Sequence, residues 1–276
     1  MAISLPLSEA PDTWFAKPAF RTRFREDSEL QLSTAELIHA NNVHIKILPT
    51  NSRQSKKLHL ILRIGELDPH KRLHLQIACG GVNCVVELGD QVSGHWNISL
   101  WDKARLTIGS NTDSLGAELM ISHGSSVRIG EDCMLSNDIF FQCGDGNHAL
   151  VNLEKKEQIS KRPASIIIGN HCWIGRKVTL LSSGRKLSIG SGTAIGIDSL
   201  VTHSLPECVT AAGSPAKVLR KKVSWTRSRK PNSEEINHLA ASVQTDLCSR
   251  NSNQGSWISR LVKTIRQRLS QTKPIR

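Results

Sequence analysis

Two histidines in the middle of the sequence have neighbours suited to proton-transfer chemistry. His148 follows Asp145 closely, and His171 lies just before Trp173. An imidazole titrates near neutral pH, so it can take a proton from a poor nucleophile such as a hydroxyl group and later release it. Asp145 would either orient such a ring or cap a turn. The residues alone leave His148 and His171 as rival general bases, and the choice depends on the scaffold that holds them.

A motif that repeats along the chain indicates the scaffold. An aliphatic residue, any residue, Ile or Leu, and then glycine recur, and successive glycines are 24, 20, 21, 39 and 21 residues apart. These glycines are Gly65, Gly89, Gly109, Gly130, Gly169 and Gly190. A fixed period near ~20 residues is typical of a solenoid, in which each repeat buries its apolar face only against its neighbours.

A finer period of six residues appears inside the later repeats. Aliphatic residues follow it in two runs, Ile168, Ile174, Leu180 and Ile189, Ile195, Val201. Six residues make one short strand and one turn, with the aliphatic side chain inward and the residue after it, often glycine, in a left-handed corner. A β-sandwich would instead alternate with a period of two. We therefore predict an all-β fold, a parallel β-helix whose triangular coils contain three such units each.

Irregular spacings predict where loops leave the β-helix. The long gap between Gly130 and Gly169 holds the least regular stretch, residues 142–164, which includes both Asp145 and His148. A smaller irregularity lies near Ser183-Gly184-Arg185. Loops on a rigid scaffold often carry binding and catalytic residues, so we expect the functional loop at 142–164.

Three segments carry a resemblance to a known family. They are Asp145-Gly146-Asn147-His148, Gly169-Asn170-His171-Cys172-Trp173-Ile174-Gly175 and the closing turn Ala212-Gly213-Ser214-Pro215-Ala216-Lys217. On these motifs the sequence resembles the hexapeptide-repeat acyltransferases, in their polysaccharide and xenobiotic O-acetyltransferase branch. The resemblance is strong over residues 120–222 and fainter over 43–120. It implies a left-handed parallel β-helix and a homotrimer with its sites between subunits.

The resemblance also implies an activity and a set of site residues. It implies transfer of an acetyl group from acetyl-CoA to a hydroxyl of a sugar or polysaccharide unit, without a covalent acyl-enzyme. A backbone N–H of a neighbouring coil would stabilise the oxyanion. The catalytic residues would be His148, as general base, and Asp145; the substrate-binding residues would be Trp173 and His171; the residues contacting acetyl-CoA would be Thr202, His203, Lys217 and Arg220.

The charge of the chain is concentrated at its C-terminal end. The net charge is +12, and residues 217–276 contain 14 Lys and Arg against 3 Asp and Glu. Such a segment suits an anionic partner: a phosphate, an acidic glycan or an anionic membrane surface. It lacks the interleaved aromatic residues of single-strand binders, so no nucleic-acid partner is predicted. Helical spacing of Ile258, Leu261, Val262, Ile265 and Leu269 predicts a basic amphipathic helix that packs on protein or lies on a membrane.

The cysteines and the start of the sequence bear on location. There are seven cysteines with no CxxC pair and no metal-ligand spacing, so neither a disulfide framework nor a metal site is predicted. Neither a signal peptide nor an apolar run of membrane-spanning length is evident. We predict a cytoplasmic protein with free, mostly buried thiols, in contact with the inner face of the membrane if the basic helix binds there.

These observations divide the chain into three parts and leave two other functions open. We predict a lead-in or cap at residues 1–42, the β-helix acyltransferase domain at 43–222, and a basic, helical extension at 223–276. The same base and donor would serve an N-acetyltransferase acting on an amino-sugar or amino acid. A non-catalytic β-helix scaffold is the alternative from another class, and it would have no polar loop of this kind.

Overall fold

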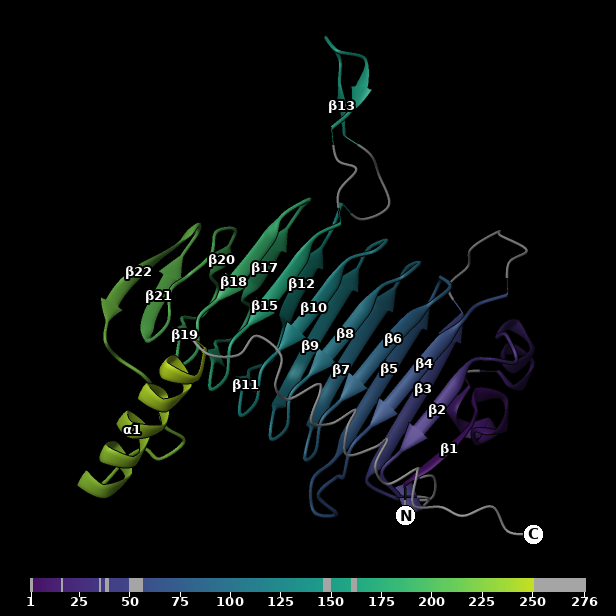
Figure 1. Ribbon diagram of the computed structural model, residues 1–276, viewed down its shortest axis with the longest axis horizontal. Helices are drawn as coiled ribbons and strands as arrows, with labels where there is room; N and C mark the ends of the chain where they lie inside the picture. The colour runs from purple at the N-terminus through teal and green to yellow at the C-terminus, as the bar shows by residue number, and fades with distance from the viewer. Residues whose placement is uncertain are drawn as a thin grey trace. The chain divides into compact units, whose positions relative to one another are not determined.

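The computed structural model confirms a parallel β-helix, and it describes residues 2–15, 17–34, 36–37, 40–49, 57–145, 150–159 and 163–250. One side of the β-helix is an eight-stranded sheet, called sheet A, whose strands stack like rungs in Figure 1. Its strands, in spatial order, are β1 (Ile3–Pro6), β2 (Glu29–Leu32), β4 (Leu60–Ile64), β6 (Cys84–Leu88), β8 (Arg105–Ile108), β10 (Ser126–Ile129), β15 (Ser165–Ile168) and β18 (Lys186–Ile189).

A twelve-stranded sheet, called sheet B, forms the rest of the wall. Its strands are β3 (Val43–Pro49), β5 (Leu73–Cys79), β7 (Ser93–Leu100), β9 (Asp113–Ile121), β11 (Met134–Leu135), β12 (Ile139–Cys143), β16 (Trp173–Ile174), β17 (Thr179–Ser182), β19 (Ala194–Ile195), β20 (Leu200–Val201), β21 (Val209–Gly213) and β22 (Ala216–Lys221). The start of β9 pairs with β11 and its end pairs with β12, so sheet B divides into two tracks there. Each later coil therefore has three sides.

The inward positions follow the predicted six-residue period. Ile168, Ile174 and Leu180 lie on β15, β16 and β17, and all three are buried. In the next coil Ile189, Ile195 and Val201 repeat the arrangement on β18, β19 and β20. Parallel pairing keeps successive coils in register, for example Ile168 opposite Ile189 and Ile174 opposite Ile195. The core is thus a column of stacked aliphatic residues, and it needs few aromatic side chains.

The predicted role of the repeat glycines is wrong in one respect. The described glycines with left-handed backbone include none of the motif glycines. The left-handed residue comes two positions later, as at Asn111 after Gly109 and at His171 after Gly169. The glycines are needed because the coils approach closely: a Cβ on Gly109 would lie 2.6 Å from the carbonyl carbon of Gly130. The predicted glycine period is present, but glycine recurs because neighbouring coils leave no room for a Cβ. It does not recur because the corner needs a left-handed backbone at that position.

Gly109 gives a direct test of this close approach. Its φ lies outside the left-handed region, and a Cβ there would lie 2.6 Å from the carbonyl oxygen of Gly130 on the next coil. We expect Gly109→Ala to lower the free energy of unfolding by about 1–3 kcal/mol in a urea titration, because the stacked coils must move apart to admit the methyl group. Gly116→Ala is the matched control, because its Cβ would meet nothing closer than 3.7 Å. Equal stability of the two variants would contradict close stacking as the reason for glycine.

The six cysteines of the β-helix are free thiols, as predicted. Five of these six are buried and one, Cys208, is half-buried. Inward thiols bond to carbonyls at the coil corners, as Cys133 does to Gly169 and Cys172 to Gly190, both at 3.2 Å. Burial raises the pKa of the Cys133 thiol well above its usual range and that of Cys143 to about 11. These cysteines therefore behave as small apolar core residues rather than as nucleophiles.

The two ends of the chain are built differently from the coils. The N-terminal segment contains η1 (Leu7–Glu9), η2 (Asp12–Trp14) and η3 (Pro18–Arg23), and it adds an antiparallel strand, β1, to the edge of sheet A. Ile3–Trp225 forms one compact unit. The second unit contains α1 (Ser233–Arg250), which has Glu234 and Glu235 in its first turn. The predicted basic helix, Ile258–Leu269, lies outside the described residues.

The β13 (Val151–Asn152) and β14 (Glu157–Gln158) strands form a small antiparallel pair within the segment between β12 and β15. This segment is the irregular stretch that the sequence predicts at 142–164. In the described parts of the chain, no helix combines the length and the apolar character needed to cross a membrane.

Candidate active site

Three consecutive turns share one corner of the β-helix, where the second track of sheet B passes into sheet A. They follow β12, β17 and β20, and we call them the loop corner. The Ser183 hydroxyl donates to Asp145 Oδ1, and Arg185 Nη2 donates to the carbonyl oxygen of Thr202 at 2.7 Å. The Thr202 hydroxyl lies 2.9 Å from His203 Nδ1. The structure therefore brings Asp145, Thr202 and His203 to one edge.

The proposed base itself falls outside what the structure describes. Residues 146–149, including His148, are among those not described. Asp145 is described and is half-buried, and its contact with Ser183 fixes the start of the segment that carries His148. The role of His148 therefore stays a prediction from its place in the sequence.

His171 lies at a different corner, between β15 and β16, in a left-handed conformation with φ of 51°. Its Nδ1 is 2.7 Å from Asp132 Oδ2, and its Nε2 is 2.8 Å from the carbonyl oxygen of Trp225. A carboxylate and a carbonyl oxygen both accept hydrogen bonds, so both ring nitrogens must carry hydrogen for both bonds to form. Both ring nitrogens of His171 thus face acceptor oxygens inside the molecule.

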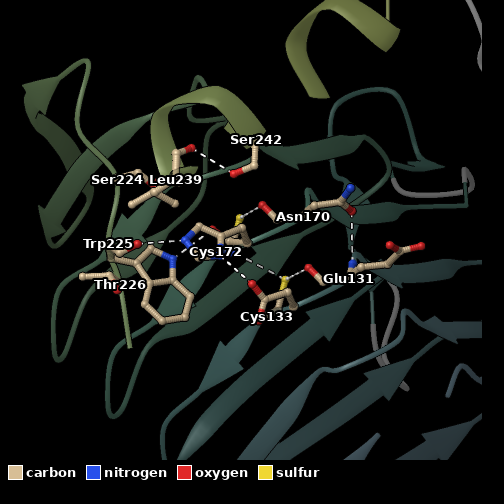
Figure 2. Close-up of polar contacts among 12 residues, drawn as sticks. Glu131, Cys133, Asn170, Cys172, Ser224, Trp225, Thr226, Leu239 and Ser242 are labelled. Carbon is tan, nitrogen blue, oxygen red and sulfur yellow. Dashed lines mark hydrogen bonds and ion pairs between the residues drawn. The ribbon is translucent and has the colours of Figure 1, made fainter. Parts of the chain in front are cut away.

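Trp225 closes over this histidine, and Figure 2 shows its indole beside the corner that carries Cys172 and Cys133. The Trp225 and His171 rings stack with centroids 4.4 Å apart and planes 8° apart, and Trp225 Nε1 donates to the His171 carbonyl oxygen at 2.8 Å. Trp225 is only 6% exposed. Sequence reasoning missed Trp225 and Asp132, because neither belongs to a repeat motif.

Removing the indole tests whether this contact holds the end of the compact unit in place. We expect Trp225→Ala to lower the free energy of unfolding by about 2–4 kcal/mol, since it loses a buried aromatic ring and its stacking. Trp225→Phe keeps a stacked ring and loses only the N–H donor, so its loss should be about 1 kcal/mol. Urea titration measures both, and a loss below about 0.5 kcal/mol for Trp225→Ala would show that the contact contributes little.

Trp173 projects from the outer side of β16 and is 42% exposed. Its ring centroid is 6.2 Å from that of Trp225, with a tilt of 49° between the planes. Strand pairing places Trp173, Ala194, Thr210 and Arg220 in one row across β16, β19, β21 and β22. At ~4.8 Å per strand, Arg220 is roughly 14 Å from Trp173. Lys217 and Arg220 are exposed on β22.

The predicted site residues therefore form two groups within one chain. Asp145, Thr202 and His203 share the loop corner. Trp173 lies on the other side of sheet A, because the chain runs from the loop corner through β15 before it reaches β16. The strand β15 between them is four residues long, a span of about 13 Å. Among the described residues, one chain thus holds Asp145 and Trp173 about one strand length apart.

A groove lies elsewhere, on the outer side of β3, β5 and β7. It has a volume of about 1210 Å³. His44, His74 and His95 stack along it with centroids 4.6 and 4.3 Å apart. Burial, and then the neighbouring imidazoles, lower the pKa of His74. No predicted site residue lines this groove, and within the described residues no group of His, Cys, Asp and Glu could hold a metal ion.

Comparisons with known proteins bear out the family resemblance. The chain is 34% identical over 128 residues to the polysialic acid O-acetyltransferase of Escherichia coli O1:K1 / APEC, a match covering 46% of this chain and 40% of that protein. It is 35% identical over 97 residues to the polysialic acid O-acetyltransferase of Neisseria meningitidis, covering 35% and 41%. The chain thus spans about two-fifths of the length of these relatives. No family model matches it.

A solved structure shows the same fold. The crystal structure of the polySia specific acetyltransferase NeuO superposes with a TM-score of 0.55 at 24% identity, covering 68% of this chain and 94% of that one. The two chains therefore share their fold over about two thirds of this chain.

Proposed function

From its relationship to the hexapeptide-repeat acyltransferases, we propose that this chain is an acetyl-CoA-dependent O-acetyltransferase acting on a hydroxyl of a sugar or polysaccharide unit. The observation that carries the proposal is the long segment between β12 and β15. The spacing from Gly130 to Gly169 is 39 residues, whereas its neighbours are 21 residues each. On an otherwise regular scaffold this segment begins at Asp145 and carries His148. A scaffold protein has no use for such a polar insertion.

In the proposed reaction, His148 takes the proton of the acceptor hydroxyl as its oxygen attacks the thioester carbonyl of acetyl-CoA. The tetrahedral oxyanion, held by a backbone N–H, collapses and breaks the carbon–sulfur bond. His148 then returns the proton to the departing CoA thiolate. Base catalysis of this kind contributes about 10²–10⁴ in rate. His171 does not compete for this role, because both of its ring nitrogens are already used by Asp132 and Trp225.

The remaining predicted residues take supporting roles in this proposal. Exposed cations on β22, Lys217 and Arg220, suit the phosphates of CoA. Thr202 and His203 present polar groups beside Asp145 at the loop corner. The exposed indole of Trp173 offers an apolar surface for substrate or for the pantetheine arm, and His171 lies two residues before it, stacked on Trp225.

The two groups of site residues favour a site between subunits. Since β15 separates Trp173 from Asp145 in one chain, a second copy can supply the missing group, as a homotrimer with closed symmetry would. The left-handed sense of the β-helix, the trimer, the cytoplasmic location and the contact of the C-terminal extension with a membrane remain predictions from the resemblance and the charge.

The decisive experiment follows release of the CoA thiol from acetyl-CoA with a panel of neutral and acidic oligosaccharides and of amine acceptors. Saccharide-dependent release with hydroxyl acceptors is expected, together with an ester product by mass spectrometry. Transfer only to amines would replace the proposal with an N-acetyltransferase. Absence of any binding of acetyl-CoA would favour the scaffold.

A further inference from the structure

A second groove lies on the outer side of sheet A, close to the loop corner. It has a volume of about 580 Å³ and crosses β4, β6 and β8. We call it the sheet A groove. Its lining residues are His59, Ile61, Arg63, Asn83, Val85, Lys103, Arg105 and Gly124.

The polar groups of this groove are mainly hydrogen-bond donors. Lys103 and Arg105 are exposed, and in the part of the chain that the structure describes neither side chain has an ion-pair partner. Asn83 Oδ1 is 3.0 Å from His59 Nδ1, which leaves the amide N–H₂ of Asn83 as a donor. A ligand for this groove must therefore supply acceptors, preferably with negative charge.

The nearby acidic groups are already in use and do not neutralise these cations. Glu87 forms an ion pair with Arg63, which also donates to Gln31 Oε1 at 2.8 Å. Asp102 Oδ1 accepts from the Val82 N–H at 2.8 Å, and its other oxygen lies 3.6 Å from His123 Nδ1. Neither carboxylate is ion-paired with Lys103 or Arg105, so both cations can bind an external anionic partner.

The floor of the groove is apolar. Ile61 and Val85 occupy neighbouring strands in register, and Arg105 follows in the same row on β8. The C–H face of a sugar ring can pack on this apolar floor. The ring would then lie next to the side chains of Lys103 and Arg105, and the guanidinium of Arg105 can bind a carboxylate with two parallel hydrogen bonds.

The groove is joined to the loop corner through the segment that carries His148. The turn at Lys103 belongs to the same corner, two coils before that segment, a distance of roughly 10 Å at ~4.8 Å per coil. Gly124 lines the groove, and a Cβ on it would lie 3.2 Å from Pro163 Cγ at the far end of the segment. A chain of linked sugars laid in the groove would lead toward this segment.

We propose that the sheet A groove binds an acidic saccharide unit of a polymeric acceptor, with its carboxylate between Lys103 and Arg105. This inference rests on the proposed function and names its substrate class: a polyanionic glycan held at a unit other than the one that is acetylated. A single sugar would not reach both places, so acceptors should bind more tightly as they lengthen.

The test measures binding by calorimetry without acetyl-CoA, so that it does not depend on catalysis. The probes are an oligogalacturonate, its methyl ester and a neutral malto-oligosaccharide of the same length. The protein is expected to prefer the acidic probe, and Lys103→Ala/Arg105→Ala should weaken that binding about tenfold to a hundredfold. Added salt should reduce the difference. Lys103→Arg/Arg105→Lys keeps both charges and should retain most of the affinity.

A matched control removes the same charges elsewhere. Lys71→Ala/Arg72→Ala lies in the exposed turn between β4 and β5 and should leave binding unchanged. Equal affinity of the protein and its Lys103→Ala/Arg105→Ala variant for the acidic probe would overturn the proposal. Equal affinity of the protein for the acidic probe and for its methyl ester would also overturn it. Weakened binding of acetyl-CoA in that variant would also overturn it, because the cations would then serve a CoA phosphate.

The outcome is separable from that of the proposed function. Charge-dependent binding of the acidic probe, without any release of CoA thiol, would support saccharide binding in the sheet A groove. It would reject the proposed transferase activity. Release of thiol with acidic saccharides, at an unchanged KM for the saccharide in the Lys103→Ala/Arg105→Ala variant, would support the transferase activity. It would reject the proposal that the sheet A groove binds the acceptor. Thermal melting of each variant checks that the β-helix is intact.

Discussion

Replacing His148 by alanine lowers kcat for saccharide-dependent CoA release by about 10²–10⁴-fold, while the dissociation constant for acetyl-CoA stays within about twofold. The reason is chemical. A sugar hydroxyl is a poor nucleophile at neutral pH, and only a base placed at its proton makes the attack fast. Because that interaction exists in the transition state and not in acetyl-CoA binding, the loss appears in kcat.

The controls for this variant separate chemistry from folding. His70→Ala removes an exposed histidine from the turn between β4 and β5 and should keep full activity. His171→Ala breaks the contacts to Asp132 and Trp225, so its first effect should be on the thermal melt. If His148→Ala keeps more than about a tenth of the activity, another group supplies the base and the proposed mechanism is wrong.

The coils were predictable because the core contacts of a solenoid recur at a fixed spacing in the sequence. Each inward residue touches only the coils above and below it, so Ile168 and Ile189 must both be aliphatic and about one coil apart. The same locality explains the misreading of the glycines. A period of stacked glycines looks alike whether glycine is needed for its φ or for a missing Cβ, and only the distance from Gly109 to Gly130 separates the two.

The site was predictable only in part, because its contacts are not periodic. The insertion at 142–164 breaks the coil spacing and could be found from the sequence. The contact between His171 and Trp225 joins residues 54 positions apart, and no repeat signals it. The sheet A groove likewise draws Asn83, Lys103 and Gly124 from three coils. The sequence period identifies the inward-facing positions. It does not predict which outward-facing side chains lie together on the surface.

Two inactive variants are expected to restore activity when they are assembled together. In the proposed trimer each site takes His148 from one subunit and Trp173 from its neighbour. Co-expressing His148→Ala chains with Trp173→Ala chains, each with its own tag, should then rebuild intact sites. With random assembly about a quarter of the sites have both residues, so activity should reach about a quarter of the unmodified protein's.

The expectation follows from the separation seen in a single chain. The whole of β15 lies between the corner that holds Asp145 and the strand that holds Trp173, so these two described residues of one copy are about one strand length apart, and a neighbouring copy can supply the nearer group. A matched pair tests the same logic in reverse. Asp145 and His148 come from one segment of one chain, so co-expressed Asp145→Ala and His148→Ala chains should restore nothing. Equal failure of both mixtures would place the whole site within one subunit, whereas recovery in the first mixture alone would establish that neighbouring copies complete it.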